Sequence, residues 1–267
     1  MSPAFVARGD GHSLFVRDWG SGPPVLLLAG WAMDSRIWGE TMLLLNAGGI
    51  RTIAYDRRGH GRSTDWGGHD YDALADDLDA VIEAFDLRDV TLVAHSGACG
   101  EAVRYLTRHG SDRIARLALV GATGPRVLAA PGEEGVTPQM LDGLCAQLAE
   151  DLPGWINDNI GPFAPGTDPR VNDWMAGMVM DCSRRAVVAF QRTIAEADLT
   201  AEAAALSLPV VLIHGDRDVS SPIEASAHRY AAIIPQAELI VYEGVAHGIM
   251  VTHPTRLAAD LAQRINR

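Results

Sequence analysis

The sequence predicts an α/β fold in which a mostly parallel, doubly wound sheet is interrupted by an inserted helical segment. Two patterns support this prediction. Short apolar runs of strand length alternate with stretches of helical period near both ends of the chain, and this alternation stops between about residues 123 and 205. Strands that alternate with helices in this way form a parallel sheet whose two faces are covered by helices.

The first pair of strands is expected at residues 25–28 and 52–55, which are fully apolar or nearly so. A helix over residues 35–47 fits between them, and Gly48 and Gly49 can end it. These segments form a strand, helix and strand unit of the expected sheet.

The alternation continues with a helix over residues 71–85, where apolar side chains recur at helical spacing, and a strand at 90–94. A second helix and strand follow at 101–109 and 117–120. After the interruption come the last predicted elements, two strands at 210–213 and 238–242 and a helix at 254–265.

The interruption divides the chain into two expected units. Residues 1–122 and 206–267 form the core domain, and residues 123–205 form an inserted helical lid. The insertion holds several large apolar residues, including Trp155, Trp174 and the run 175–180, which need an apolar surface to cover.

The composition fits one catalytic domain. The chain has 267 residues and 48% hydrophobic content, enough for a large core. Its net charge is −12, from 34 acidic and 22 basic residues, and every basic residue is Arg. Such a charge repels nucleic-acid phosphates, so nucleic-acid binding is not expected. The lack of Lys also excludes Schiff-base chemistry on a side-chain amine.

The location expected from the sequence is the cytoplasm. No apolar run approaches the roughly 20 residues that cross a membrane, and residues 1–4 do not begin a secretory signal. The chain has three widely separated cysteines, Cys99, Cys145 and Cys182, without C-x-x-C or metal-ligand spacing. We expect buried thiols, no metal and no cofactor; the sequence leaves open whether the chain forms a homo-oligomer.

A candidate nucleophile follows the strand at 90–94. Ser96 lies where this strand meets small residues and then a helix, which is typical of a sharp strand-to-helix turn that exposes a serine hydroxyl. Such a strained turn requires small residues two positions before and after the serine, and Ala94 and Ala98 meet that requirement. The alternative interpretation is a serine that only caps a helix.

A candidate acid follows the strand at 210–213. Asp216 and Asp218 both lie beyond its carboxyl end, the edge where parallel sheets place their functional groups. The spacing Gly-x-x-Asp-x-x-x-Pro from Gly215 to Pro222 selects Asp218 and leaves Asp216 for turn or surface contacts.

His247 is the candidate base, and it follows the strand at 238–242. A single His after a strand is often structural, but the chain order Ser, Asp, His is the order associated with one type of catalytic triad. His95 is the main rival, although it lies beside the nucleophile with its side chain directed elsewhere. His60 is expected to be structural.

An acyl-transfer site also needs backbone donors for the developing oxyanion. We predict these donors to be the N–H groups of Gly97, directly after the nucleophile, and of Trp31, in the loop after the first strand. The indole of Trp31 is expected to form a wall of the acyl pocket, and Trp155 and Trp174 of the lid are further candidates for the substrate pocket.

Several longer motifs resemble a known family. The chain is similar to α/β-hydrolases of the bacterial cofactor-free haloperoxidase, perhydrolase and aryl esterase group, and the likeness spans nearly the whole chain except the insertion. The matching stretches are Gly30-Trp31, residues 55–63 (YDRRGHGRS), Ser96 with residues 100–106 (GEAVRYL), residues 214–218 (HGDRD), Tyr242-Glu243-Gly244, His247-Gly248 and Thr252-His253-Pro254. The resemblance implies the α/β-hydrolase fold and the Ser96, Asp218 and His247 triad.

The chain departs from the family pattern at two places. Where such proteins commonly carry His-Gly-Trp-Pro, this chain has Ala29-Gly30-Trp31-Ala32, and the usual Ser-Met-Gly-Gly is replaced by residues 96–99 (SGAC). The loss of the His removes an expected brace of the loop at residues 29–32, which we call the oxyanion loop. The loss of the Pro favours hydrolysis over peroxide chemistry, so Ala32→Pro is predicted to raise the peroxide-dependent share.

Taken together, the sequence predicts a serine hydrolase that cleaves a small, hydrophobic carboxylic ester or lactone through an acyl-enzyme. One alternative is a cofactor-free oxygenase or carbon–carbon bond lyase that uses the His–Asp pair as a base. A binding protein without catalysis is a third class, but such a protein is expected to lose the base, and His247 is present.

Overall fold

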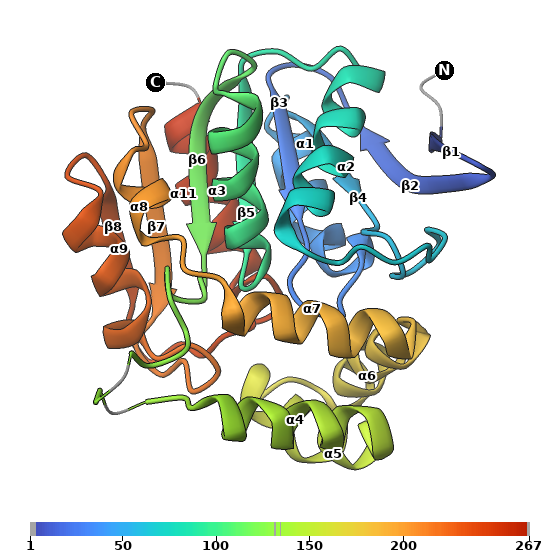
Figure 1. Ribbon diagram of the computed structural model, residues 1–267. Coiled ribbons are helices and arrows are strands. Elements are labelled where there is room, and N and C mark those ends of the chain that lie inside the picture. The colour runs from blue at the N-terminus through green and yellow to red at the C-terminus, as the bar shows by residue number, and fades with distance from the viewer. Residues whose placement is uncertain (1–3, 131, 134, 266–267) are drawn as a thin grey trace.

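The computed structural model describes residues 4–130, 132–133 and 135–265. Within them one eight-stranded sheet, ordered β1-β2-β4-β3-β5-β6-β7-β8, runs through the centre of the molecule with helices on both faces (Figure 1). The pairs from β4 to β8 are parallel. The predicted α/β class is therefore confirmed.

The parallel strands form where the apolar runs were noted. Their bounds are β3 (Pro24–Leu28), β4 (Arg51–Tyr55), β5 (Val90–His95), β6 (Ile114–Val120), β7 (Val210–Gly215) and β8 (Glu238–Tyr242). Central strands are covered on both faces, so continuous apolar sequence is their signature. Leu26 of β3, for example, pairs with Ile53 of β4 and with Leu92 of β5, and all three are fully buried. The carboxyl ends of these strands meet at one edge, which is the lower edge in Figure 1.

Two strands were not expected from the sequence. β1 (Phe5–Gly9) and β2 (His12–Trp19) form an antiparallel hairpin, and β2 continues the sheet by pairing antiparallel with β4. The turn between them, Asp10-Gly11, has φ of 48° and 79°. Two consecutive left-handed residues match the tight hairpin turn that twists with its strands.

Helices cover both faces of the sheet. The first face carries α2 (Tyr71–Ala84), α3 (Ala98–His109), α8 (Thr200–Ala204) and α9 (Ala227–Ile233), and the second carries α1 (Gly39–Ala47), α10 (Ile249–Thr252) and α11 (Pro254–Ile265). Two one-turn 3-10 helices, η1 (Ser35–Trp38) and η2 (Ile223–Ala225), lie outside the insertion, whereas α8 belongs to its end. In α2 the apolar side chains fall on one stripe, and Asp70 caps its first turn by accepting a hydrogen bond from the Ala73 N–H.

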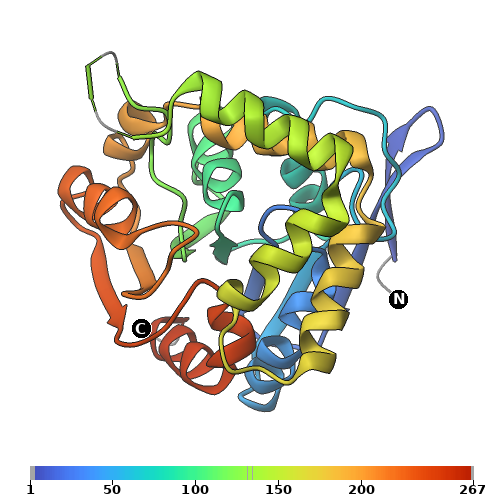
Figure 2. The same cartoon turned by 90° about the horizontal axis from the view of Figure 1, so that it is seen from below.

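The segment between β6 and β7 forms loops and helices in its described residues. It holds α4 (Pro138–Glu150), α5 (Leu152–Phe163), α6 (Pro169–Asp181), α7 (Arg184–Glu196) and α8, with only isolated bridges such as Arg126 to Asp198. Helices α4 to α7 lie across the carboxyl edge of the sheet, below it in Figure 1 and toward the viewer in Figure 2. They are therefore placed over the edge at which the sequence locates its candidate site.

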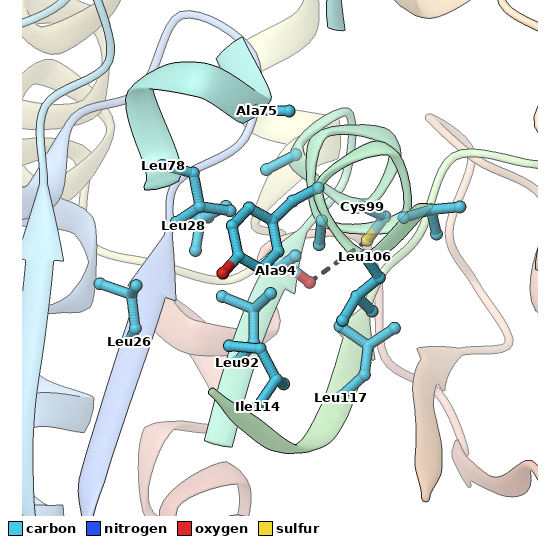
Figure 3. Close-up of a cluster of buried hydrophobic side chains, with 14 of the residues drawn as sticks. Leu26, Leu28, Ala75, Leu78, Leu92, Ala94, Cys99, Leu106, Ile114 and Leu117 are labelled. Atoms are coloured by element: carbon cyan, nitrogen blue, oxygen red, sulfur yellow. Dashed lines mark hydrogen bonds between the residues drawn. The ribbon is translucent and has the colours of Figure 1, made fainter. Parts of the chain in front are cut away.

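The core under the candidate nucleophile is tightly filled. Figure 3 shows Leu92 and Ala94 of β5 facing side chains of the neighbouring strands and of helices α2 and α3. The Cys99 thiol donates a hydrogen bond to the Ala94 carbonyl at 3.2 Å, which ties the first turn of α3 to the end of β5 (Figure 3). Among the described residues, no helix combines the length and the apolar character needed to cross a bilayer.

Candidate active site

Ser96 lies on a strained turn between β5 and α3. Its φ is 56°, in the left-handed region that non-glycine residues rarely adopt, and its side chain is almost buried. The Ser96 N–H donates to the Val120 carbonyl at 3.0 Å, so the turn is fixed to the neighbouring strand β6. Ala94 and Ala98, on either side of the turn, are fully buried, which explains the need for small residues there.

His247 links the serine to an acid. It lies in the loop between β8 and α10, with its Nε2 2.9 Å from the Ser96 Oγ and its Nδ1 2.6 Å from Asp218 Oδ2. A carboxylate can only accept a hydrogen bond, so His247 donates from Nδ1, and Nε2 is free to accept the serine proton. The structure thus brings Ser96, His247 and Asp218 together as one hydrogen-bonded chain.

The Asp218 carboxylate is held in the charged form. Burial acts to raise its pKa, but the neighbouring His247 and hydrogen bonds from His214, from His247 and from the Ser221 N–H outweigh burial and lower the pKa below its ordinary value. The Ser221 N–H donates to Asp218 Oδ1 at 2.8 Å, which leaves Oδ2 directed at the imidazole.

His214, at the end of β7, is a neighbour that the sequence argument missed. Its Nε2 lies 3.3 Å from Asp218 Oδ2 and donates to the Ser221 carbonyl at 2.8 Å. It therefore holds both ends of the turn that carries the acid. The sequence did carry a signal for this contact, because His214 precedes Asp218 by only four residues at the end of the same strand.

The three alternative candidates for the acid and the base lie outside this hydrogen-bonded triad. Asp216 accepts a hydrogen bond from the Gly244 N–H at 2.6 Å and lies at the surface. His95 donates from Nε2 to the His247 carbonyl at 3.2 Å, and burial lowers its pKa well below the ordinary value, so it stays neutral. His60 is buried among structural contacts, and burial lowers its pKa to about 3.

The two predicted oxyanion donors lie beside the serine. Gly97 follows it directly, and Trp31 lies in the turn after β3, where the Met33 N–H donates to the Gly30 carbonyl at 3.3 Å. A Cβ on Gly30 would lie 3.0 Å from the Ser96 Cβ, so only glycine lets this loop approach so closely. Among the residues that the structure describes, no backbone carbonyl accepts a hydrogen bond from the N–H groups of Trp31 and Gly97.

A cavity of about 620 Å³ opens above Ser96 and His247. It lies between the sheet edge and helices α4 to α7, and residues such as Trp155, Ile160 and Ile194 line it. The Trp31 and Trp155 rings meet edge to face with centroids 5.0 Å apart, and the Phe163 ring lies 5.5 Å from the His247 ring. The site is therefore a mostly apolar chamber with a polar floor, which is typical of a small-molecule site.

The expectation for Trp174 is wrong. Its side chain is 40% exposed, and it does not occur among the described residues that line the cavity. It lies on α6, which turns Met175, Met178 and Val179 toward the core instead. Helical geometry places Trp174 about 100° around the helix from Met175, and this rotation carries the indole out to solvent.

The structure also corrects the expected effect of a proline at position 32. Ala32 has a φ of 54°, whereas proline fixes φ near −65°. Ala32→Pro should therefore distort the oxyanion loop and lower ester hydrolysis and peroxide-dependent bromination together, instead of raising the peroxide share. Parallel assays of both reactions, with Ala32→Gly as the control that tolerates a positive φ, test this expectation. An Ala32→Pro protein with undiminished hydrolysis would contradict it.

Comparison with known proteins places this fold in a family. Residues 25–260 match the alpha/beta hydrolase family. The chain is 37% identical to a non-heme haloperoxidase of Rhodococcus erythropolis, over 96% of this chain and 97% of the relative, and 33% identical to a bifunctional esterase/perhydrolase of Acinetobacter calcoaceticus, over 96% and 97%. An esterase from Exiguobacterium antarcticum superposes with a TM-score of 0.94 at 27% identity, covering 99% of both chains.

These similarities confirm the resemblance noted in the sequence and the fold that it implied. They extend over the segment between β6 and β7 as well as the rest of the chain, because the matches cover nearly the whole chain. The chain belongs to the α/β-hydrolase family.

Proposed function

We propose that this protein hydrolyses carboxylic esters or lactones by a two-step acyl transfer. The observation that carries the proposal is the continuous chain from Ser96 Oγ through the His247 imidazole to Asp218, at the floor of an apolar cavity. Relatives whose names include esterase and perhydrolase, and an esterase among the similar structures, support the same reaction class.

In the first step, the Ser96 Oγ attacks the substrate carbonyl while His247 Nε2 takes the hydroxyl proton. The carbonyl oxygen becomes an oxyanion, for which the N–H groups of Trp31 and Gly97 are the candidate donors. His247 then returns the proton to the leaving alkoxide, and the acyl group remains on Ser96 as an ester. Asp218 keeps the imidazole in the tautomer that can accept at Nε2 and stabilises the imidazolium.

In the second step, water takes the place of the alcohol. His247 removes a proton from the water, the resulting hydroxide adds to the acyl carbonyl, and the tetrahedral intermediate collapses with return of the proton to Ser96 Oγ. Hydrogen peroxide can enter at the same point and give a peroxyacid, which is the basis for a secondary perhydrolase activity. The substrate is inferred to be a small hydrophobic molecule because the cavity is lined mostly by apolar side chains.

The proposed reaction is tested by assaying p-nitrophenyl esters, lactones and peroxide-dependent bromination on one preparation. We expect hydrolysis to exceed bromination, with activated esters and strained lactones turned over fastest. The proposal would be contradicted if peroxide-dependent bromination were faster than the hydrolysis of every ester and lactone tested.

We further propose that the segment 123–205 acts as a lid that sets the substrate range, and that the protein works in the cytoplasm. The lid proposal rests on the cavity residues that α4 to α7 contribute. The location is supported by three free, buried cysteines, which suit a reducing compartment.

The lid proposal predicts different effects for two tryptophans of the insertion. Trp155→Ala should widen the cavity beside Trp31 and shift the preference among p-nitrophenyl esters toward longer acyl chains, with a larger change in KM than in kcat for acetate. Trp174→Ala is the matched control, because its indole lies outside the cavity, and it should leave chain-length preference unchanged. Equal preferences in the wild type and Trp155→Ala would contradict the lid proposal.

A further inference from the structure

A buried arginine lies directly behind the oxyanion loop. The Arg57 side chain is 3% exposed, and its Nη2 donates to the Ala29 carbonyl at 2.9 Å, while its Nη1 lies 3.4 Å from the Gly30 carbonyl. Ala29 and Gly30 are the two residues immediately before Trp31. The guanidinium therefore holds the segment whose orientation sets the direction of the Trp31 N–H.

The same guanidinium is attached to the nucleophile's helix. Its Nε and Nη2 lie 2.8 Å and 2.6 Å from Oε2 of Glu101, a fully buried residue in the first turn of α3. The Tyr55 hydroxyl donates to the other carboxylate oxygen of Glu101. Burial is the largest effect and raises the pKa of Glu101 above its ordinary value, while Arg57 and Tyr55 act in the opposite direction. Arg57 and Glu101 thus connect the oxyanion loop to the helix that begins just after Ser96.

Helix α7 covers this connection from the lid side. The Phe190 ring lies over the guanidinium, with its centroid 4.4 Å from the Arg57 Cζ. One turn earlier, the Val187 carbonyl accepts a hydrogen bond from the Trp31 indole N–H at 2.8 Å. One turn later, Ile194 fills the space beside Gly97, where an added Cβ would overlap its side chain. A single helix therefore contacts both residues that carry the candidate oxyanion donors.

We propose that Arg57 is a positioning residue for the oxyanion hole, which joins the backbone of the Trp31 loop to α3 through Glu101 and is held in place by Phe190 of α7. This inference rests on the proposed acyl transfer. Arg57 supports the loop at the position where the usual His is absent, because a charged group holds the backbone carbonyl of Ala29 itself. Donors fixed in advance stabilise an oxyanion more strongly than donors that must reorganise during the reaction.

Arg57→Lys tests the proposal. Lysine keeps the positive charge opposite Glu101 but cannot reproduce the planar arrangement that reaches the carboxylate and both carbonyls. We expect kcat for p-nitrophenyl acetate to fall roughly 10- to 100-fold, with KM nearly unchanged. The affinity for a trifluoromethyl ketone should fall by a similar factor, because its adduct with Ser96 carries an oxyanion. The midpoint of the pH–rate profile should not move, since the His247 and Asp218 pair is untouched.

Arg58→Lys is the matched control. Arg58 is also buried, donates to the fully buried Asp77 at 2.6 Å and to three backbone carbonyls, and lies over the Trp66 ring at 4.5 Å, but none of these contacts is with the oxyanion loop. A comparable loss of thermal stability with kcat retained is expected there. If Arg57→Lys behaves like Arg58→Lys, with lower stability but unchanged kcat and ketone affinity, the inference is wrong.

A second pair of variants tests the same inference if the Arg57→Lys protein does not fold. Phe190→Leu should lower kcat and ketone affinity, whereas Phe85→Leu, in the core at the end of α2, should not. Equal kcat and ketone affinity in the two leucine variants would overturn the inference. A wild-type protein that neither hydrolyses esters nor binds the ketone would instead contradict the proposed function, and the positioning role would then fall with it.

Discussion

Ser96→Ala is expected to lower kcat for ester hydrolysis by about four to six powers of ten, to the residual rate that binding and backbone donors provide alone. The reason is that the Ser96 Oγ is the atom 2.9 Å from His247 Nε2, and alanine leaves the base without a nucleophile to activate. Steady-state hydrolysis of p-nitrophenyl acetate, with far-ultraviolet circular dichroism to verify folding, measures this effect.

The neighbouring Ser220 is a suitable control. It lines the same cavity but is exposed and makes no contact with the imidazole among the described residues, so Ser220→Ala should keep most of the activity. A Ser96→Ala protein whose kcat for ester hydrolysis falls only slightly would contradict the acyl-enzyme mechanism. It would favour the alternative in which the His247 and Asp218 pair acts as a base on an acidic organic substrate.

Asp218→Asn is expected to lower kcat by about four powers of ten while the fold is preserved. The asparagine amide can donate a hydrogen bond to Nδ1, which favours the imidazole tautomer with its proton on Nε2. In that tautomer Nε2 can no longer accept the Ser96 proton. The variant also loses the negative charge that stabilises the imidazolium, and kcat measured across pH tests both effects.

Asp216→Asn is the matched comparison, because the same substitution two residues away alters only an exposed turn. Its kcat should stay close to that of the wild type. The assignment of the acid would be reversed by the opposite result, in which Asp216→Asn is inactive and Asp218→Asn retains activity.

The sequence was most informative where a single local pattern determined the structure. The parallel strands are continuous apolar runs because both of their faces are buried, so β3, β5 and β7 could be located from sequence alone. The hairpin of β1 and β2 was missed because both strands are only partly buried and their apolar pattern is mixed. Its turn did carry a signal, since an Asp-Gly pair is favoured in two-residue hairpins.

The candidate residues Ser96, Asp218 and His247 could be predicted because each lies in the segment that follows a strand, and the ends of parallel strands meet at one edge of the sheet. Contacts between distant segments could not be predicted in this way. The link from the Trp31 indole to the Val187 carbonyl spans 156 positions, and the link from Arg57 to Glu101 spans 44. Trp174 shows the same limit, because composition placed it in the lid but not on the face that lines the cavity.

The support of the loop after β3 is a further example of this limit. From the loop residues alone, the loss of the usual His at position 29 predicts a missing brace. In the folded chain the loop is held by Arg57 from the end of β4 and by Val187 from α7, neither of which is near Ala29 in sequence.

The most direct test of the central proposal is to trap the acyl group on Ser96. The enzyme is mixed with p-nitrophenyl acetate, quenched with acid within the first turnover, digested and analysed by mass spectrometry. The proposed mechanism predicts a burst of p-nitrophenol close to the enzyme concentration and one acetyl group on the peptide that contains Ser96, both absent in Ser96→Ala. Hydrolysis by the wild type with an acetyl group on another residue, or with the burst retained in Ser96→Ala, would contradict it.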